Sequence, residues 1–356
     1  MSANDHIHLD PAQRKPHLKD QPTTSSAPAS LPLGKQHSHP RGSTGDEDAI
    51  VFFIGNATTV LEWNGVRILT DPNFLHAGDH VHLGPGVSGK RLKSPAVDLH
   101  ELPPLDCILL SHYHEDHFDR MVEGSLSRDF PIITTPHAKK CLTSDRNEDD
   151  PFTSVRALDF FQSVMLYVDG TDSGSSDGKA AKTPVIKVTA TPGKHVPPGL
   201  LSMANDLLHA VPPTNGYLLE LGYSPSPPPA RPTAAPELSP DGYRIYISGD
   251  TLFVDELREI PERLGRGRID LMLVHLGGTT IPSPSAPLVM VTMDAEQGLK
   301  LMRLMDPDVT VPIHFDDYDL FLSPLSDFKA GVSEEGWDGR VVYLDRGEQY
   351  RFKVRE

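Results

Sequence analysis

Short apolar runs, many of them ended by Gly, Pro, Asn or Asp, recur along the chain from Ala49 onward. Runs of this kind, rich in Val, Ile and Leu and bounded by turn-forming residues, are typical of β-strands. Asn64-Gly65, between two of the runs, is the signal of a tight hairpin turn. The pattern predicts strands at residues 50–54, 58–63, 66–69, 106–110, 132–134, 163–168, 185–191, 243–247, 269–276 and 309–313, followed by strands that start at Val341 and Gln349.

Between some of these strands the pattern favours helices instead. The predicted helices cover residues 136–142, 254–264 and 292–305. Thr292 is the expected N-cap of the last one, with Glu296 near its first turn. Alternation of strands with helices predicts an α/β fold.

Residues 1–48 lack this patterning and are rich in Pro, Ser and His. Because such a segment cannot bury much apolar surface, we expect a disordered tail ahead of a single domain at residues 49–356. Its five histidines either gather a metal or are scattered in a solvated tail, and their lack of regular spacing favours the second interpretation. Flexible inserts are expected near 169–183 and near 224–241, since strand patterns resume on either side of each.

The acidic composition restricts the partners of the chain. It has 33 Lys and Arg against 49 Asp and Glu, a formal net charge of −16. That disfavours a broad nucleic-acid-binding surface, which needs cations to displace counterions. No apolar run approaches the roughly 18 residues that span a bilayer. No targeting signal is recognisable in the sequence. The two cysteines, Cys107 and Cys141, are most simply interpreted as reduced thiols. We therefore expect a cytoplasmic protein, with no transmembrane segment or nucleic-acid partner, whose oligomeric state stays open.

One segment carries a dense set of metal-binding residue types. Directly after the predicted strand at 106–110, the sequence reads Ser-His-Tyr-His-Glu-Asp-His, which supplies His112, His114, Asp116 and His117. Imidazole nitrogens and carboxylate oxygens are ligands that Zn²⁺ prefers. A loop that leaves a strand can direct the first two histidines to one point and the last two residues to a neighbouring one. The sequence therefore predicts a metal site here.

Three further candidate ligands follow other apolar runs. They are His195, Asp250 and His314, and each stands where a predicted strand meets a loop. Singly, each could be an ordinary loop residue. Together with the histidine-rich segment they complete two metal shells.

The order of these motifs is similar to that of the metallo-β-lactamase superfamily. Four further segments, at residues 55–58, 70–74, 84–85 and 101–106, resemble the branch that includes ascorbate-phosphate lactonases and N-acylphosphatidylethanolamine phospholipase D. The resemblance covers roughly residues 49–320 and implies a four-layer αββα sandwich. It does not identify a substrate, because this fold carries many reactions.

The resemblance also implies a ligand set. His112, His114 and His195 would hold one ion, and Asp116, His117 and His314 would hold the other. Asp250 would bridge the two ions together with a shared water or hydroxide. Asp71 resembles a residue that orients a ligand imidazole, with a simple turn residue as the alternative. Two zinc ions are expected, although manganese or iron suits the same nitrogen and oxygen ligands.

His275 departs from the family pattern. It ends a predicted strand on the same side as His314, so it either touches the substrate or is a hydrogen-bonded core histidine. With the first interpretation left open, the candidate catalytic residues are Asp116, Asp250 and His275.

The charge of the expected site favours an enzyme that hydrolyses small molecules. Two divalent ions bring four positive charges, and two carboxylates with one hydroxide return three, so the pocket favours negative charge that develops on a substrate. Hydrolysis of a small-molecule ester, lactone or lactam is the leading hypothesis. The alternatives are a phosphodiesterase of the phospholipase D-like branch, for which residues 199–213 could form an apolar groove, and a non-catalytic metal-binding protein. An iron oxidoreductase is disfavoured, because no flavin domain is recognisable.

Overall fold

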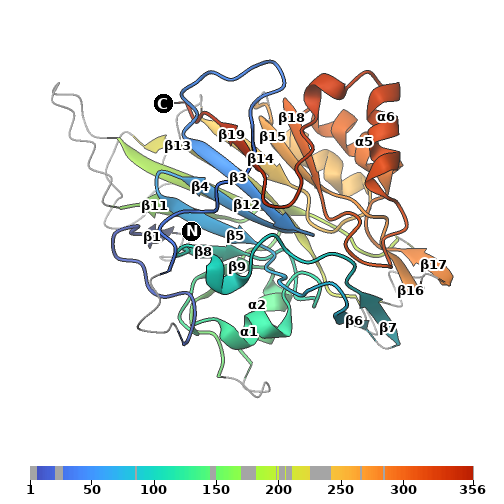
Figure 1. Ribbon diagram of the computed structural model, residues 1–356, viewed down its shortest axis with the longest axis horizontal. Helices are drawn as coiled ribbons and strands as arrows, with labels where there is room; N and C mark the ends of the chain where they lie inside the picture. Colours follow the sequence, from blue (N-terminus) through green and yellow to red (C-terminus); the bar gives the residue numbers. More distant parts are fainter. Residues whose placement is uncertain are drawn as a thin grey trace.

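Two mixed β-sheets packed face to face form the centre of the molecule (Figure 1). The computed structural model describes residues 6–20, 27–84, 86–144, 150–169, 182–197, 199, 205, 211–224, 242–264, 267–283 and 285–355. One sheet has the strand order β1-β11-β12-β13-β14-β15-β18, and the other has the order β10-β9-β8-β5-β4-β3-β19-β2. Each sheet combines parallel with antiparallel neighbours.

The strands have the following bounds. The seven-stranded sheet contains β1 (His6–Leu9), β11 (Ser163–Val168), β12 (Thr183–Pro192), β13 (Asn215–Ser224), β14 (Tyr243–Ile247), β15 (Leu271–His275) and β18 (Val309–Ile313). The eight-stranded sheet contains β10 (Val155–Ala157), β9 (Ile132–Thr134), β8 (Cys107–Leu109), β5 (Val66–Thr70), β4 (Thr58–Trp63), β3 (Ala49–Gly55), β19 (Gln349–Phe352) and β2 (Gln36–His37). Two hairpins stand apart from the sheets: β6 (His80–Gly84) with β7 (Val87–Lys90), and β16 (Thr280–Ser283) with β17 (Ala286–Met290).

Helices cover both outer faces of the sandwich. The eight-stranded sheet carries α1 (Arg120–Ser125) and α2 (Pro136–Leu142), and the seven-stranded sheet carries α4 (Glu259–Leu264), α5 (Ala295–Met305) and α6 (Leu325–Glu334). Short 3₁₀ turns lie at η1 (Leu99–Glu101), η2 (Asp255–Arg258) and η3 (Asp338–Arg340). One apolar cluster fills the space between the sheets, and two others lie under the two helical layers. The four-layer αββα arrangement expected from the sequence is confirmed.

The apolar runs in the sequence are explained by burial on both faces of a strand. Along β3, Val51 and Phe53 point into the cluster between the sheets, whereas Phe52 and Ile54 point into the cluster under α1 and α2. Successive side chains of a strand face opposite sides, so a strand covered on both sides is apolar at every position. This layering leaves the strand ends and their loops to carry polar chemistry.

The expectation of a disordered tail is wrong for residues 6–20 and 27–48. Strand β1 pairs in parallel with β11, and Leu9 and Leu31 are buried in the domain. The tail is ordered because the edge of β11 offers unpaired backbone groups to β1. A few isolated apolar residues are enough to fix it, and they are too sparse to produce a periodic pattern.

Several other elements differ from the expectations. The structure adds β13, α1, α6 and the two hairpins, which the sequence did not predict. Val341 forms an isolated bridge with Thr310 instead of starting a strand. The N-cap of α5 is Asp294, because Thr292 donates its hydroxyl to Asp250 instead. Most of the two predicted inserts and of the loop at 199–213 lies outside the described residues.

Among the described residues, none of the helices combines the length and the apolar character needed to cross a lipid bilayer.

Candidate metal centre

The candidate ligands meet at one edge of the sandwich, where strands end. β14, β15 and β18 run parallel, so Asp250, His275 and His314 leave the sheet at the same edge. The loop after β8 brings the histidine-rich segment there from the other sheet, and His195 arrives after β12. All seven residues predicted as ligands lie together, as the sequence led us to expect, and all but His114 are fully buried or nearly so.

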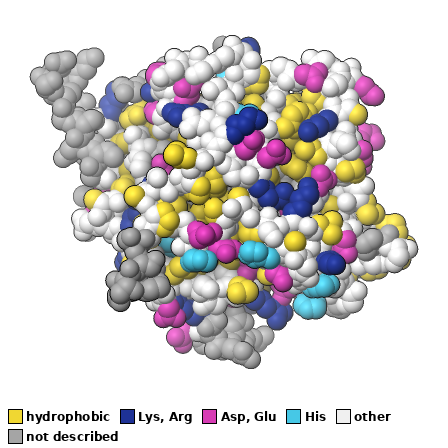
Figure 2. Space-filling view, viewed as in Figure 1, with side chains coloured by type: hydrophobic (Ala, Val, Ile, Leu, Met, Phe, Trp, Pro, Cys, Tyr) yellow, Lys and Arg dark blue, Asp and Glu magenta, His cyan; other side chains and the backbone are white. Residues whose placement is uncertain are grey.

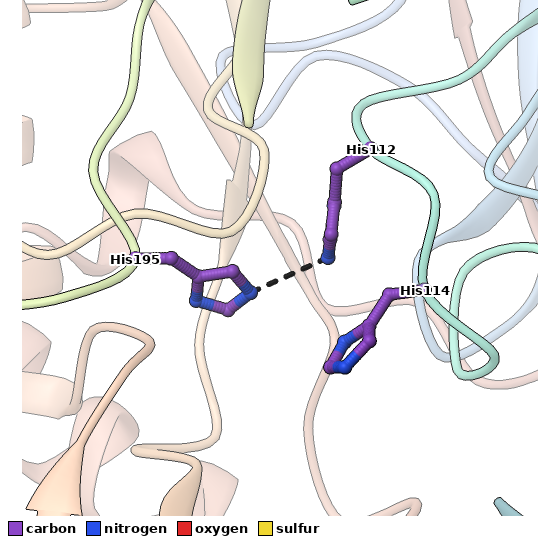
Figure 3. Close-up of side chains that lie close together, drawn as sticks. All are labelled: His112, His114 and His195. Carbon is purple, nitrogen blue, oxygen red and sulfur yellow. Dashed lines mark hydrogen bonds between the residues drawn. The ribbon is translucent and has the colours of Figure 1, made fainter. Parts of the chain in front are cut away.

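His112, His114 and His195 form the first group (Figure 3). In the figure, His112 and His114 project from one loop toward His195, which projects from the opposite side. His112 Nε2 and His195 Nε2 are 3.3 Å apart. The three candidate ligand atoms lie within 4.8 Å of one another, close enough to share one ion.

Asp116, His117, Asp250 and His314 form the second group. His117 Nε2 lies 3.2 Å from His314 Nε2, and Asp250 Oδ2 lies 3.3 Å and 3.5 Å from these two nitrogens. The same Asp250 oxygen is 3.7 Å from His195 Nε2 of the first group. Asp250 therefore stands between the two groups.

Hydrogen bonds at the far side of three rings turn the other nitrogen toward the centre. His195 Nδ1 donates to the carbonyl of Val291 at 2.6 Å, and His314 Nδ1 donates to that of Leu276 at 2.9 Å. A carbonyl only accepts, so the proton is on Nδ1 and the Nε2 lone pair is free to bind a metal. Ser111 Oγ lies 2.9 Å from His112 Nδ1 in the equivalent place. Sequence patterns did not reveal these contacts, because any residue has a backbone carbonyl.

Asp71 and His275 lie behind His117. Asp71 Oδ2 is 3.3 Å from His117 Nδ1, and Asp71 Oδ1 accepts from the Ser111 amide at 2.7 Å. His275 Nε2 is 3.6 Å from Asp71 Oδ2, and its ring stacks on that of His117 at 5.9 Å. Ser248 Oγ lies 3.3 Å from His275 Nδ1. Of the two interpretations of His275, this placement favours the buried histidine that supports its neighbours.

Two of these residues have strained backbones. His314 and Asp71 have φ angles of 58° and 36°, in the left-handed region that residues other than glycine rarely adopt. Such conformations persist where the surroundings hold them, and they gather at functional sites. The backbone at His314 is held by its amide, which donates to the carbonyl of Asn56 at 2.7 Å.

Burial and neighbouring charges shift the pKa values of the site. Burial and the neighbouring imidazoles keep the pKa of His112 well below its usual range, and burial lowers the pKa of His195 to about 4. Burial alone would raise the pKa of Asp250, but the imidazoles of His314 and His117 outweigh it and hold that pKa well below normal. These two histidines are thus neutral and Asp250 is ionised, as metal ligands must be.

His117 shows the opposite effect. Burial would lower its pKa, yet the carboxylates of Asp250, Asp116 and Asp71 together hold it well above the usual range. Three buried carboxylates around one imidazole attract positive charge, and a metal ion competes with the proton for that place.

The residues fit divalent metal ions by a second test. His114 Nε2 and Asp250 Oδ1 are buried and have no hydrogen-bond partner within the described part of the chain. An unsatisfied buried polar atom costs about 1–3 kcal/mol, which a bound cation would remove. The nitrogen and oxygen donors suit zinc, and equally manganese or iron.

A family model described as a beta-lactamase superfamily domain matches residues 66–315, a span that includes all seven candidate ligands. The chain belongs to the β-lactamase superfamily. This membership confirms the family that the sequence motifs suggested, and it agrees with the two-sheet architecture described above.

Relatives of this superfamily member are named as hydrolases. It is 24% identical over 302 residues to a metal-dependent hydrolase of Archaeoglobus fulgidus, covering 85% of this chain and 98% of that protein. It is 24% identical over 307 residues to N-acyl-phosphatidylethanolamine-hydrolyzing phospholipase D 1 of Caenorhabditis elegans, covering 83% of this chain and 74% of the relative. The isothiocyanate hydrolase from Delia radicum gut bacteria shares the fold, with a TM-score of 0.61 at 20% identity over 86% of this chain and 100% of that one. The protein is a metal-dependent hydrolase of the β-lactamase superfamily.

Proposed function

We propose that this protein holds two divalent metal ions and hydrolyses a small-molecule ester, lactone or lactam. Asp250 carries the proposal, because its carboxylate stands within 4 Å of imidazoles from both ligand groups. One ion would be held by His112, His114 and His195, and the second by Asp116, His117 and His314, with Asp250 shared. Zinc is the expected metal.

Different side chains would bind such a pair of ions and hold the ligands in place. When bound, such ions would supply a water of lowered pKa as the nucleophile and would stabilise negative charge on the substrate. Thr292 donates its hydroxyl to Asp250 Oδ2 at 2.9 Å and so fixes the shared carboxylate. Asp71 accepts from Ser111 and faces His117, which holds the histidine-rich loop in place.

Charge near the site supports a small substrate. Lys194, next to His195, pairs with Glu256, so its charge is balanced within the protein. On the face shown in Figure 2, Lys and Arg are interspersed with Asp and Glu instead of forming a basic tract. The chain has a net charge of −16, which repels a polyanion. This charge supports a small substrate that contacts the metal ions without needing a basic surface.

A metal analysis joined to a substrate panel tests the proposal. The panel contains lactones, lactams, simple esters, a phosphodiester and an isothiocyanate. We expect two transition-metal ions per chain and turnover of at least one carbonyl compound, lost on chelation and restored by Zn²⁺ or Mn²⁺. Protein purified without chelator that holds no transition metal would exclude the two-metal site.

A phosphodiesterase is the second candidate, because the Caenorhabditis elegans relative is named as a phospholipase D. Cleavage of a phosphodiester with every carbonyl compound left untouched would favour this alternative over the first.

A further inference from the structure

A buried polar network lies behind the loop that carries the histidine-rich segment. We call it the clamp, and it consists of Asn56, Asn73, Arg91 and Asp317, all with fully buried side chains. The four residues follow β3, β5, β7 and β18, respectively. Fully buried charges and amides need firm partners, so this network is a defined feature of the fold.

Two asparagines of the clamp hold the backbone of the histidine-rich loop, at Asp116 of the second ligand group and at Glu115 directly before it. Asn56 Nδ2 donates to the carbonyl of Asp116 at 2.7 Å, and Asn73 Nδ2 donates to that of Glu115 at 2.9 Å. The carbonyl of Asn56 accepts from the His314 amide at 2.7 Å. Asn56 therefore joins two ligands of the same group from opposite sides.

A buried ion pair fixes the two asparagines. Arg91 Nη1 donates to Asn73 Oδ1 at 2.5 Å, and this leaves the Asn73 amino group directed at the loop. Arg91 Nη2 lies 3.6 Å from Asp317 Oδ1, and Asp317 Oδ2 accepts from the Asn56 amide at 2.7 Å. Arg346 also pairs with Asp317, so the two arginines together hold this buried carboxylate and keep the clamp in one arrangement.

The first ligand group has different supports. His195 contacts the carbonyl of Val291, and His112 contacts Ser111, whose hydroxyl also lies 3.4 Å from His117 Nδ1 of the second group. Across the residues that the structure describes, no hydrogen bond joins the clamp to His112, His114 or His195. The support of the centre is thus asymmetric.

From this asymmetry we propose that the clamp is a positioning device for one ion only. It sets the affinity of the site formed by Asp116, His117, Asp250 and His314 and leaves the His112, His114 and His195 site unaffected. The inference rests on the proposed two-metal function. Partners behind metal ligands typically change metal affinity by about 10–100-fold, and we expect a loss of that size at the second site alone.

The test uses variants in which one of the two sites is weakened. In the full-length chain, His112→Ala leaves the second group as the stronger site, and His314→Ala leaves the first. Asn73→Ala and Asn56→Ala each remove the amino donor to the loop without adding a charge. Each is added to both backgrounds, and zinc affinity is measured by competition with a chromophoric chelator. Arg91→Met is a third clamp variant. Arg67→Met is its matched control, because Arg67 is also buried and donates to the carbonyls of Pro104 and Ala29, away from the loop.

We expect each clamp substitution to weaken zinc binding by about 10–100-fold in the His112→Ala background and to leave it unchanged in the His314→Ala background. Arg67→Met should change neither. An equal loss in both backgrounds, or no loss in either, would overturn the clamp. A wild-type chain that binds no zinc would instead reject the proposed function. If Arg91→Met fails to fold, as judged by circular dichroism, the two asparagine variants still decide.

Discussion

Asp250 and His275 are buried at the same edge of the sheet and have different surroundings. Asp250 faces imidazoles of both ligand groups, whereas His275 faces Asp71 and the ring of His117. The difference places Asp250 among the candidate ligands and makes His275 a candidate positioning residue that acts through Asp71.

Asp250→Ala should therefore abolish turnover and lower the metal content, because it removes one of the two carboxylates, Asp116 being the other, that lie beside imidazoles of both groups. His275→Leu should reduce kcat/KM by about 10–100-fold at most and keep both ions. The measurements are kcat/KM on the substrate found in the panel and zinc per chain by elemental analysis. Near wild-type activity of Asp250→Ala with two ions bound would show that the site is assigned incorrectly.

His17 is a buried histidine far from the candidate ligands in sequence. It is fully buried, packs edge-on against Phe130, and has its pKa lowered by burial. In the unfolded chain it titrates near 6.5. Between its folded pKa and 6.5 only the unfolded chain binds the proton, so the contribution of His17 to stability is lost as the pH falls below about 6.5.

His17→Leu should remove this dependence. Below pH 6.5, the free energy of unfolding of the wild type should fall relative to that of the variant by up to about 1.4 kcal/mol per pH unit. Urea unfolding at pH 7.5, 6.5 and 5.5 measures it, and His100→Leu, at an exposed position, is the control. A difference that stays constant over this range would contradict the assignment.

At the scale of elements, β1 changes the role of the N-terminal segment. β1 covers the edge of β11, and Leu9 adds a side chain to the cluster between the sheets. Burial of a leucine contributes about 1.5–3 kcal/mol. Removal of β1 would also leave the edge of β11 unpaired, which favours aggregation.

Deletion of residues 1–45 should therefore destabilise the domain. We expect a loss of several kcal/mol, since Leu9 and Leu31 both leave the core, and Leu9→Ala alone should cost about 2–5 kcal/mol. Urea midpoints and size-exclusion chromatography report the two effects. Deletion of residues 1–5, which precede β1, is the control. If the 1–45 deletion kept the urea midpoint of the wild type, the segment would not contribute to the stability of the domain.

The same elements show what sequence patterning can and cannot reveal. β4 was predicted with its observed bounds, because it is rich in β-branched and apolar residues and Asn64-Gly65 ends it. β13 was missed because Gly216, Gly222 and Glu220 interrupt its apolar positions. β1 was missed because it is ordered by pairing with a strand distant in sequence, which no local pattern encodes.

The candidate site was predictable for a related reason. His195, Asp250 and His314 each follow a recognisable strand, and the parallel strands β14 and β18 lead the last two to one edge. The clamp could not be predicted, because Arg91 and Asp317 become partners only when the chain between β7 and the end of β18 folds back. Candidate ligands at strand ends can be predicted from a sequence. The residues that hold them in place cannot, because they come together only through tertiary contacts.

At the scale of the whole molecule, the candidate metal centre draws its residues from both sheets. The histidine-rich loop leaves the eight-stranded sheet, whereas His195, Asp250 and His314 leave the seven-stranded one. Ions bound between them would therefore link the halves of the sandwich. A ligand that binds only the folded state adds RT ln(1 + [L]/Kd), about 4 kcal/mol for each site when the free ion is at 1,000 times its Kd.

Metal removal should lower the stability of the entire fold for this reason. Treatment with a chelator should lower Tm by about 10 °C or more, since 1 kcal/mol corresponds to roughly 2–4 °C in a domain of 150–250 residues. At neutral pH the loss is increased because three buried carboxylates, Asp71, Asp116 and Asp250, are left with the neighbouring imidazoles as counterions. Differential scanning calorimetry before chelation, after it and after addition of Zn²⁺ measures the effect.

Mg²⁺ should not restore Tm, because it prefers octahedral oxygen ligands over imidazole. His314→Ala should show a smaller drop on chelation than the wild type, as one of its two sites is already weakened. A Tm that does not respond to chelator in protein shown to contain zinc would mean that the ions do not bridge the sheets.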